Sequence, residues 1–227
     1  MPRKKRPLDR TTGIERDASI VVVACEDTYA VKQYFAKFRT RRTQLTVLPT
    51  EDCRSNPRAV IERLHDHKRK YAQEEGDEFW FCIDADHWIC GHHQRELSQV
   101  LQECRQKGYG IAISNPCFEV WLLLHFTEIN DEIVLRMLGK NSSETVNIEE
   151  LESLRCDSFV HELRNFAGQY NKSRVSALKL SAAQVRQATQ RAQDRDTGNG
   201  DVPQVPGTRV YKLVESLLHR DSINLDP

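Results

Sequence analysis

The sequence has no long apolar run. Its longest such stretch within 227 residues, VWLLLHF, is far shorter than the ~20 residues that a membrane-spanning helix needs. The basic N-terminus, MPRKKRPLDR, is followed by no apolar signal core. We therefore expect neither membrane insertion nor secretion.

Paired cysteines and the common nucleotide-binding and nucleophile motifs are also missing. The seven cysteines are an odd number, and no two of them form a CxxC pair. We therefore expect a reducing cytoplasm and no disulfide framework. No GxxxxGK[ST] motif is present, which excludes nucleotide hydrolysis by a P-loop, and no GxSxG motif indicates a serine nucleophile.

An excess of either charge is missing as well, because 33 basic residues balance 33 acidic ones. Basic residues nevertheless cluster at positions 3–6 and again at Arg39, Arg41 and Arg42. Such clusters hold phosphates in nucleic-acid-binding proteins, which makes both of them candidate nucleic-acid contacts. The alternative is a solvated tail and a charged helix end.

The sequence does contain alternating strand and helix patterns. Apolar, β-branched or aromatic runs predict strands at 19–25, 44–48, 79–83 and 109–113, with helices between them. This alternation indicates βαβ units. We predict an α/β fold with a mostly parallel four-stranded sheet flanked by helices. The predicted parts are a flexible basic arm (1–17), an α/β core (18–128) and a helical C-terminal region packed on that core (129–227).

Within the C-terminal region, helical patterns cover four segments. We predict helices at 131–139, 147–168, 173–195 and 208–219. The segment TGNGDVPQVPG before the last of them is too rich in Gly, Pro and Asn for a helix, and is predicted to be a loop.

Acidic residues follow three of the predicted strands. Glu26 follows the first strand, Asp84 and Asp86 follow the third, and Glu119 lies in the first turns of the helix after the fourth. Parallel sheets bind ligands outside the carboxyl ends of their strands, so we expect these residues to converge. Asp84 and Asp86 project to one side, and a divalent cation would relieve their repulsion. Carboxylates suit Mg²⁺ or Mn²⁺, which assist phosphoryl transfer or hydrolysis.

A purely local role is the alternative for each of these acids. The two aspartates would cap a turn and face solvent, and each glutamate would favour the positive end of a helix. Neighbouring residues have similar alternatives. His87 is placed to contact a phosphate or donate a proton, or is an exposed loop histidine. Asn115 is predicted to cap the next helix, with Pro116 in its first turn, which would leave backbone N–H groups to attract a phosphate.

Two further sets of residues near this segment are not predicted to take part in the site. His87, Cys90, His92 and His93 are possible zinc ligands, but their spacing fits no standard structural zinc pattern. The apolar face that follows Asn115 is predicted to be core, and it includes Phe118, Trp121, Leu122 and a hydrogen-bonded, packed His125.

Five segments carry a family resemblance. The order strand–Glu26–helix followed by FCIDAD resembles the Toprim domain of topoisomerases, bacterial primases and OLD-type nucleases. VVVACEDTYAVKQYF and AISNPCFEVWLLLHF (112–126) resemble the opening and the S-N-P-x-F-E-x-W-x-L-L-H-F segment of the RloB-like family. QYNKS (169–173) and GTRVYKLVESL (207–217) resemble its C-terminal signatures. The chain departs from the family pattern at Asp27, usually glycine, and at Tyr29, which follows Thr28 where a glutamate is usual.

The resemblance implies a Toprim-like, Mg²⁺- or Mn²⁺-dependent endonuclease that acts on DNA or RNA, including tRNA, in bacterial phage defence. It implies metal binding by Asp84 and Asp86, and a role as ligand or general acid/base for Glu26. Glu119 would assist, and Lys172 would neutralise a phosphate. An ABC-type or SMC-like ATPase is the implied partner. The alternative is a non-catalytic regulatory subunit that docks on such an ATPase.

Overall fold

A five-stranded sheet organises the computed structural model, which describes residues 18–51, 54–71, 73–89, 93–220 and 224–225. The sheet has the order β3-β1-β4-β5-β6. Its strands are β1 (Ser19–Cys25), β3 (Thr43–Leu48), β4 (Glu78–Asp84), β5 (Gly110–Asn115) and β6 (Gly207–Thr208). The first four are parallel, and β6 pairs antiparallel with β5. This mostly parallel sheet confirms the predicted α/β fold.

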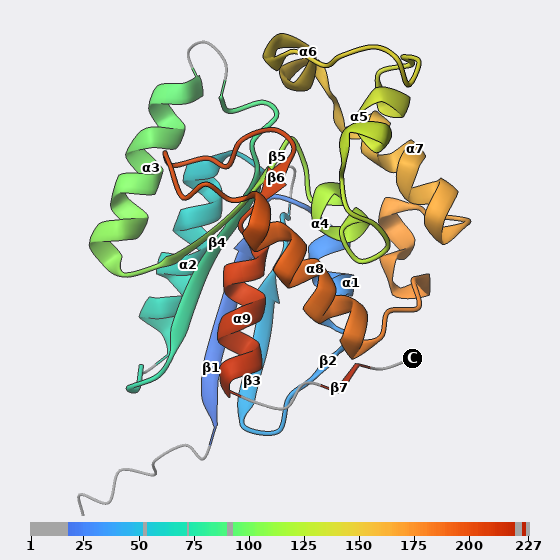
Figure 1. Ribbon diagram of the computed structural model, residues 1–227. Coiled ribbons are helices and arrows are strands. Elements are labelled where there is room, and N and C mark those ends of the chain that lie inside the picture. Colours follow the sequence, from blue (N-terminus) through green and yellow to red (C-terminus); the bar gives the residue numbers. More distant parts are fainter. Residues whose placement is uncertain (1–17, 52–53, 72, 90–92, 221–223, 226–227) are drawn as a thin grey trace, which may run out of the picture.

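Helices cover both faces of the sheet (Figure 1). One face packs against α2 (Pro57–Lys70) and α3 (His93–Lys107). The other packs against α1 (Ala30–Phe35), α4 (Glu119–Leu123), α8 (Ala182–Arg195) and α9 (Val210–Arg220). Alternate residues of each buried strand face opposite clusters, as the pleat requires, which explains why the central strands read as continuous apolar runs.

Shorter elements complete the chain. They are α5 (Asp131–Met137), α6 (Ile148–Ser153), α7 (Cys156–Ala167), the 3₁₀ helix η1 (Lys172–Ala177), and a small antiparallel ribbon of β2 (Phe38–Arg39) and β7 (Asn224–Leu225). The single helix predicted for 147–168 is divided at Leu154, which has extended backbone and is buried. The helix predicted for 173–195 is likewise two elements, η1 and α8. Both predictions were therefore wrong, because each placed one continuous helix where the structure has two separate elements.

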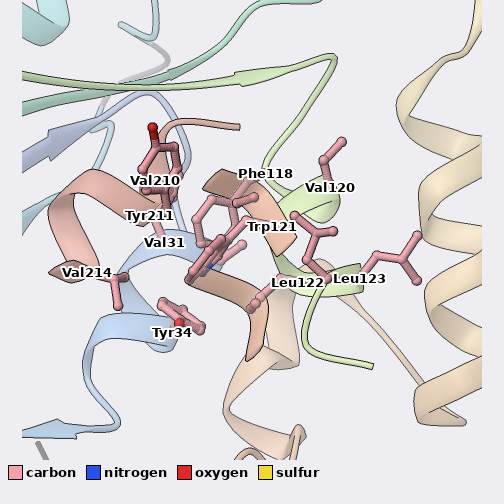
Figure 2. Packing of buried hydrophobic residues seen from close by; sticks show 14 of the residues in the cluster. Val31, Tyr34, Phe118, Val120, Trp121, Leu122, Leu123, Val210, Tyr211 and Val214 are labelled. Atoms are coloured by element: carbon pink, nitrogen blue, oxygen red, sulfur yellow. The ribbon is translucent and has the colours of Figure 1, made fainter. Parts of the chain in front are cut away.

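One hydrophobic cluster joins residues from both sides of position 128 (Figure 2). Tyr34 of α1 and Trp121 of α4 lie in it with Val210 and Val214 of α9. Fully burying one large apolar side chain stabilises a fold by about 1.5–3 kcal/mol. The helices after position 128 are therefore held to the sheet by the same core that holds α1 and α4.

His125 lies inside this cluster, as predicted, and is hydrogen-bonded there. Its Nε2 is 3.1 Å from the Tyr34 hydroxyl, and its Nδ1 is 2.9 Å from the carbonyl oxygen of Trp121. Burial lowers its pKa to about 4. The histidine is therefore neutral at physiological pH, and its role is packing.

No helix within the described part of the chain combines the length and the apolar character that crossing a membrane requires.

Candidate functional site

The carboxyl edge of the sheet has a topological switch point between β1 and β4. The chain leaves β1 toward β3 on one side and leaves β4 toward β5 on the other, so the connections after these two strands diverge. Ligands of open α/β sheets bind at such a point. Glu26 follows β1 and Asp84 ends β4, and the backbone N–H of Asp84 donates to Glu26 Oε1 at 2.9 Å. The predicted convergence of these two acids is confirmed.

Glu26 is fixed through both carboxylate oxygens. Besides the Asp84 amide on Oε1, the indole N–H of Trp88 donates to Oε2 at 3.1 Å. Burial raises the pKa of Glu26 to about 7, because it outweighs these two hydrogen bonds and is reinforced by the charges of Asp86 and Asp27. This carboxyl group therefore exchanges a proton near neutral pH.

Asp84 lacks compensation for its charge. No residue in the described segments donates a hydrogen bond to its carboxylate. Burial raises its pKa well above the ordinary value, and the charges of Glu26 and Glu119 raise it further, while Lys172 opposes them. The position is short of positive charge.

The two carboxylate oxygens of Glu119 differ in their partners among the described residues. Its side chain is 1% exposed, and its Oε1 accepts a hydrogen bond from the Tyr170 hydroxyl at 2.9 Å and lies 3.2 Å from Lys172 Nζ. Its Oε2 is buried and has no partner among the residues described. One oxygen is thus held by the C-terminal region, and the other has no hydrogen-bond partner among the described residues.

Lys172 and Tyr170 bring the C-terminal region into the site. Burial lowers the pKa of Lys172, but the carboxylate of Glu119 outweighs this and holds the pKa above its ordinary value. Lys172 was a predicted site residue, and the structure places it against Glu119. Tyr170 was not predicted, and the only signal in the sequence is its place two residues before Lys172 in QYNKS.

Asp86 contacts a different set of groups. Its Oδ2 lies 3.3 Å from the Cys156 thiol at the start of α7 and 3.5 Å from Nε2 of His87. The His87 side chain is 82% exposed, the position that its alternative reading gave it. Cys156 was not predicted, and nothing in the sequence links it to Asp86.

The predicted divalent metal requires suitable ligand atoms at this edge of the sheet. No group of three or more His, Cys, Asp or Glu residues in the described part of the chain is placed to hold a metal ion. Mg²⁺, however, is commonly held by one or two carboxylates together with water and substrate phosphates. Asp84 and the free oxygen of Glu119 are hard oxygen donors without hydrogen-bond donors of their own. These residues fit such a cation chemically.

Of the four possible zinc ligands, Cys90 and His92 lie outside the described residues. His93 is the first residue of α3 and is exposed.

The arginine cluster lies at the opposite edge of the sheet. Arg42 precedes β3, and its carbonyl oxygen accepts a hydrogen bond from the backbone N–H of Ser19, the first residue of β1. The seven residues of β1 place this edge about 20 Å from Glu26. Arg39, Arg41 and Arg42 are exposed there and are not brought to the acidic residues. The other basic cluster, residues 3–6, lies outside the described residues.

Asn115 does not cap a helix, so that prediction was wrong. It ends β5, its side chain donates to the carbonyl oxygen of Pro203 at 2.8 Å, and α4 begins only at Glu119. Before α1, Oδ1 of Asp27 accepts hydrogen bonds from the backbone N–H of Tyr29 at 2.7 Å and from that of Ala30. Asp27, where the RloB-like pattern has glycine, thus fixes the start of α1.

The comparison with known families covers the whole site. A family model described as RloB-like protein matches residues 21–217. This span includes both central strands, Glu119 and the Tyr170–Lys172 segment. No solved structure and no protein of curated function matches the chain. Because the family model covers most of its length, the chain belongs to the RloB-like protein family.

Proposed function

We propose that the protein is a Mg²⁺- or Mn²⁺-dependent nuclease that hydrolyses phosphodiester bonds in DNA or RNA. One observation carries the proposal: Glu26, Asp84 and Glu119, distant in sequence, meet at the switch point of the sheet with too little positive charge around them. Buried acids with raised pKa values in this position are typical of functional sites.

The bound cation would stabilise negative charge on the phosphoryl oxygens. Asp84 and the free oxygen of Glu119 would hold it. Glu26 has a pKa of about 7, so its carboxyl group takes up or releases a proton at neutral pH, as a general acid or base requires. Lys172 stays protonated beside Glu119 and offers a second positive charge to the substrate phosphate.

Family membership supports a proposal for the process in which the protein acts and for its partner. The protein would act in bacterial phage defence in the cytoplasm, with an ABC-type ATPase as its partner. Five free cysteines among the described residues fit a reducing compartment.

A second candidate is a non-catalytic regulatory subunit of the ATPase complex. Two observations favour it: no three potential ligands in the described part of the chain are grouped for a metal, and Lys172 already neutralises part of Glu119. Here the acidic residues would fix the fold at the sheet edge, and the C-terminal helices would bind the partner.

Cleavage and metal binding, measured separately, distinguish the two. Plasmid DNA and total RNA are incubated with the purified protein, with and without Mn²⁺, and calorimetry measures Mn²⁺ binding without substrate. Asp84→Asn and Glu119→Gln should each lower cleavage by at least about a hundredfold, because each removes a proposed cation ligand. Asp157→Asn, which changes an exposed acid of α7, is the matched control and should behave as wild type.

The nuclease proposal fails if wild-type protein binds no Mn²⁺ and cleaves neither substrate, even when the partner ATPase is added. Cleavage only with the ATPase present would support a nuclease that its partner activates. Equal cleavage by wild type and Asp84→Asn would assign the activity to other residues.

A further inference from the structure

A groove of about 600 Å³ opens beside the acidic residues at the carboxyl edge of the sheet. Its lining includes Asp86, residues of α6, and residues 202–205 before β6. Its volume is that of a typical small-ligand pocket. The proposed nuclease chemistry makes no use of it.

The lining of the groove favours an uncharged, flat ligand group. Ile148, Leu151 and Val205 supply apolar surface, and Ile148 is 73% exposed although it is a large apolar residue. Two carboxylates, those of Asp86 and Glu152, also line the groove and would repel a phosphate. Asn115 also lines the groove, and its carboxamide oxygen is buried and has no hydrogen-bond donor among the described residues.

We infer that this groove holds one unpaired base of the substrate strand, so that the protein selects single-stranded nucleic acid. The inference rests on the proposed function, because it places the neighbouring phosphate at Asp84 and Glu119. A base has two apolar faces and polar edges, which matches the lining. In a duplex the bases are stacked and paired, so none of them enters a groove of this kind without being flipped out.

Two exposed residues support a single strand. Tyr29, 55% exposed, lies at the start of α1, where its backbone N–H donates to Asp27, and it offers an aromatic face on which a neighbouring base can stack. Arg155 lines the groove and is exposed, and its guanidinium, which donates from Nη1 to the carbonyl oxygens of Glu152 and Leu154, has further donors for a phosphate flanking the bound base.

Binding tests this inference without relying on cleavage. A labelled oligonucleotide of about 16 nucleotides, the upper end of typical single-strand site sizes, is titrated alone and as a duplex, and anisotropy is recorded. Ca²⁺ replaces Mg²⁺ because it takes the same oxygen ligands at longer distances, and a gel confirms that the probe is intact. We expect the single strand to bind at least about tenfold more tightly than the duplex.

Two variants of α6 locate the contact. Ile148→Glu places a negative charge at the groove and should weaken single-strand binding about tenfold. Ser153→Glu adds the same charge to an exposed position of the same helix that does not line the groove, and should bind as wild type. Thermal unfolding checks that both variants are folded.

Equal affinity for duplex and single strand would overturn the inference, and so would equal losses in the two variants. Failure to bind either probe would also overturn it, and would leave the groove to a segment of the partner protein. Groove-dependent single-strand binding without metal-dependent cleavage would retain this inference and reject the nuclease proposal. Cleavage of duplex at the single-strand rate would do the reverse.

Discussion

Two acidic sites in this chain, both at least partly buried, are built on opposite principles. Asp196, after α8, has a side chain that is 2% exposed, and it accepts hydrogen bonds from Arg209 Nε at 3.0 Å and from the Tyr211 hydroxyl at 3.0 Å. Burial alone would raise its pKa, but the hydrogen bonds of Arg209 outweigh burial and hold the pKa below its ordinary value. At the carboxyl edge, Glu26 and Asp84 have raised pKa values instead.

The difference lies in the partners rather than in the depth. A buried carboxylate stabilises a fold when hydrogen bonds and a counter-charge offset its desolvation. Asp196 has both, and its cluster fixes residues 199–201 through carbonyl oxygens that accept from Arg209. Asp84 has neither a donor to its carboxylate in the described part of the chain nor a close counter-charge of its own. We interpret the first as structural and the second as kept for a ligand.

Removing the counter-charge from the structural site should have the largest effect. Arg209→Met leaves Asp196 buried without its bonded guanidinium, with the Tyr211 hydroxyl and Lys212 at 3.7 Å as weaker compensation, and should lower the free energy of unfolding by about 3 kcal/mol. Urea unfolding monitored by circular dichroism measures this. Arg186→Met, an exposed arginine of α8, is the control and should change stability by less than about 0.5 kcal/mol. Similar values for both variants would show that the Asp196 cluster is not structural.

The acidic edge should instead lose stability as pH rises. The pKa of Glu26 is raised in the folded state, so folded protein retains a proton that unfolded protein has released. Between pH 4.5 and about 7 this favours unfolding increasingly, by about 3 kcal/mol in total. Asp196 has the opposite sign, because its pKa is lowered and its contribution is lost only in acid.

Glu26→Gln isolates this contribution, since its amide oxygen still accepts from the Asp84 backbone. The stability of wild type relative to Glu26→Gln, measured by urea unfolding with EDTA present, should fall across that pH range. A difference independent of pH would mean that Glu26 is ionised throughout.

The central strands could be predicted because local sequence determines them. The runs at 20–25 and 79–83 are apolar throughout, which is the composition of strands buried on both faces. The two-residue strand β6 has no periodicity of its own and exists because β5 pairs with it. Asn115 was misread for the same reason, since its partners, Gly207 and Pro203, are about ninety residues away.

The residues of the candidate site also fall into two groups, those that local sequence predicts and those that depend on tertiary packing. Glu26 and Asp84 end strands, so topology alone brings them together. Tyr170 and Cys156 reach the site through packing of the C-terminal helices, which no local pattern encodes. Lys172 was anticipated only through its family motif. The position of Arg42 at the other edge could not be predicted, because a basic cluster carries no information on which edge it occupies.

One substitution made at both sites should have effects of opposite sign. Asp84→Asn removes a charge that Glu26 and Glu119 repel, and should raise the free energy of unfolding at pH 7 by about 1 kcal/mol. Asp196→Asn removes the partner of Arg209 and should lower it by about 2 kcal/mol. Urea unfolding of both variants in EDTA tests the pair, and a loss of stability in Asp84→Asn would contradict our interpretation of the acidic edge.

The smallest expected effect gives the finest comparison, because each site contains one tyrosine hydroxyl bonded to a carboxylate. Tyr170→Phe removes the bond to Glu119, and Tyr211→Phe removes the bond to Asp196. Each should lower the free energy of unfolding by about 1 kcal/mol, the usual contribution of one hydrogen bond.

The effects of these two variants on metal-dependent cleavage should differ. Without Tyr170, Lys172 is the one remaining side chain in the described segments that holds Glu119, so cleavage by Tyr170→Phe should fall about tenfold, while Tyr211→Phe cleaves as wild type. Equal cleavage by the two variants would mean that Tyr170 is structural, like Tyr211, and that the orientation of Glu119 does not limit the reaction.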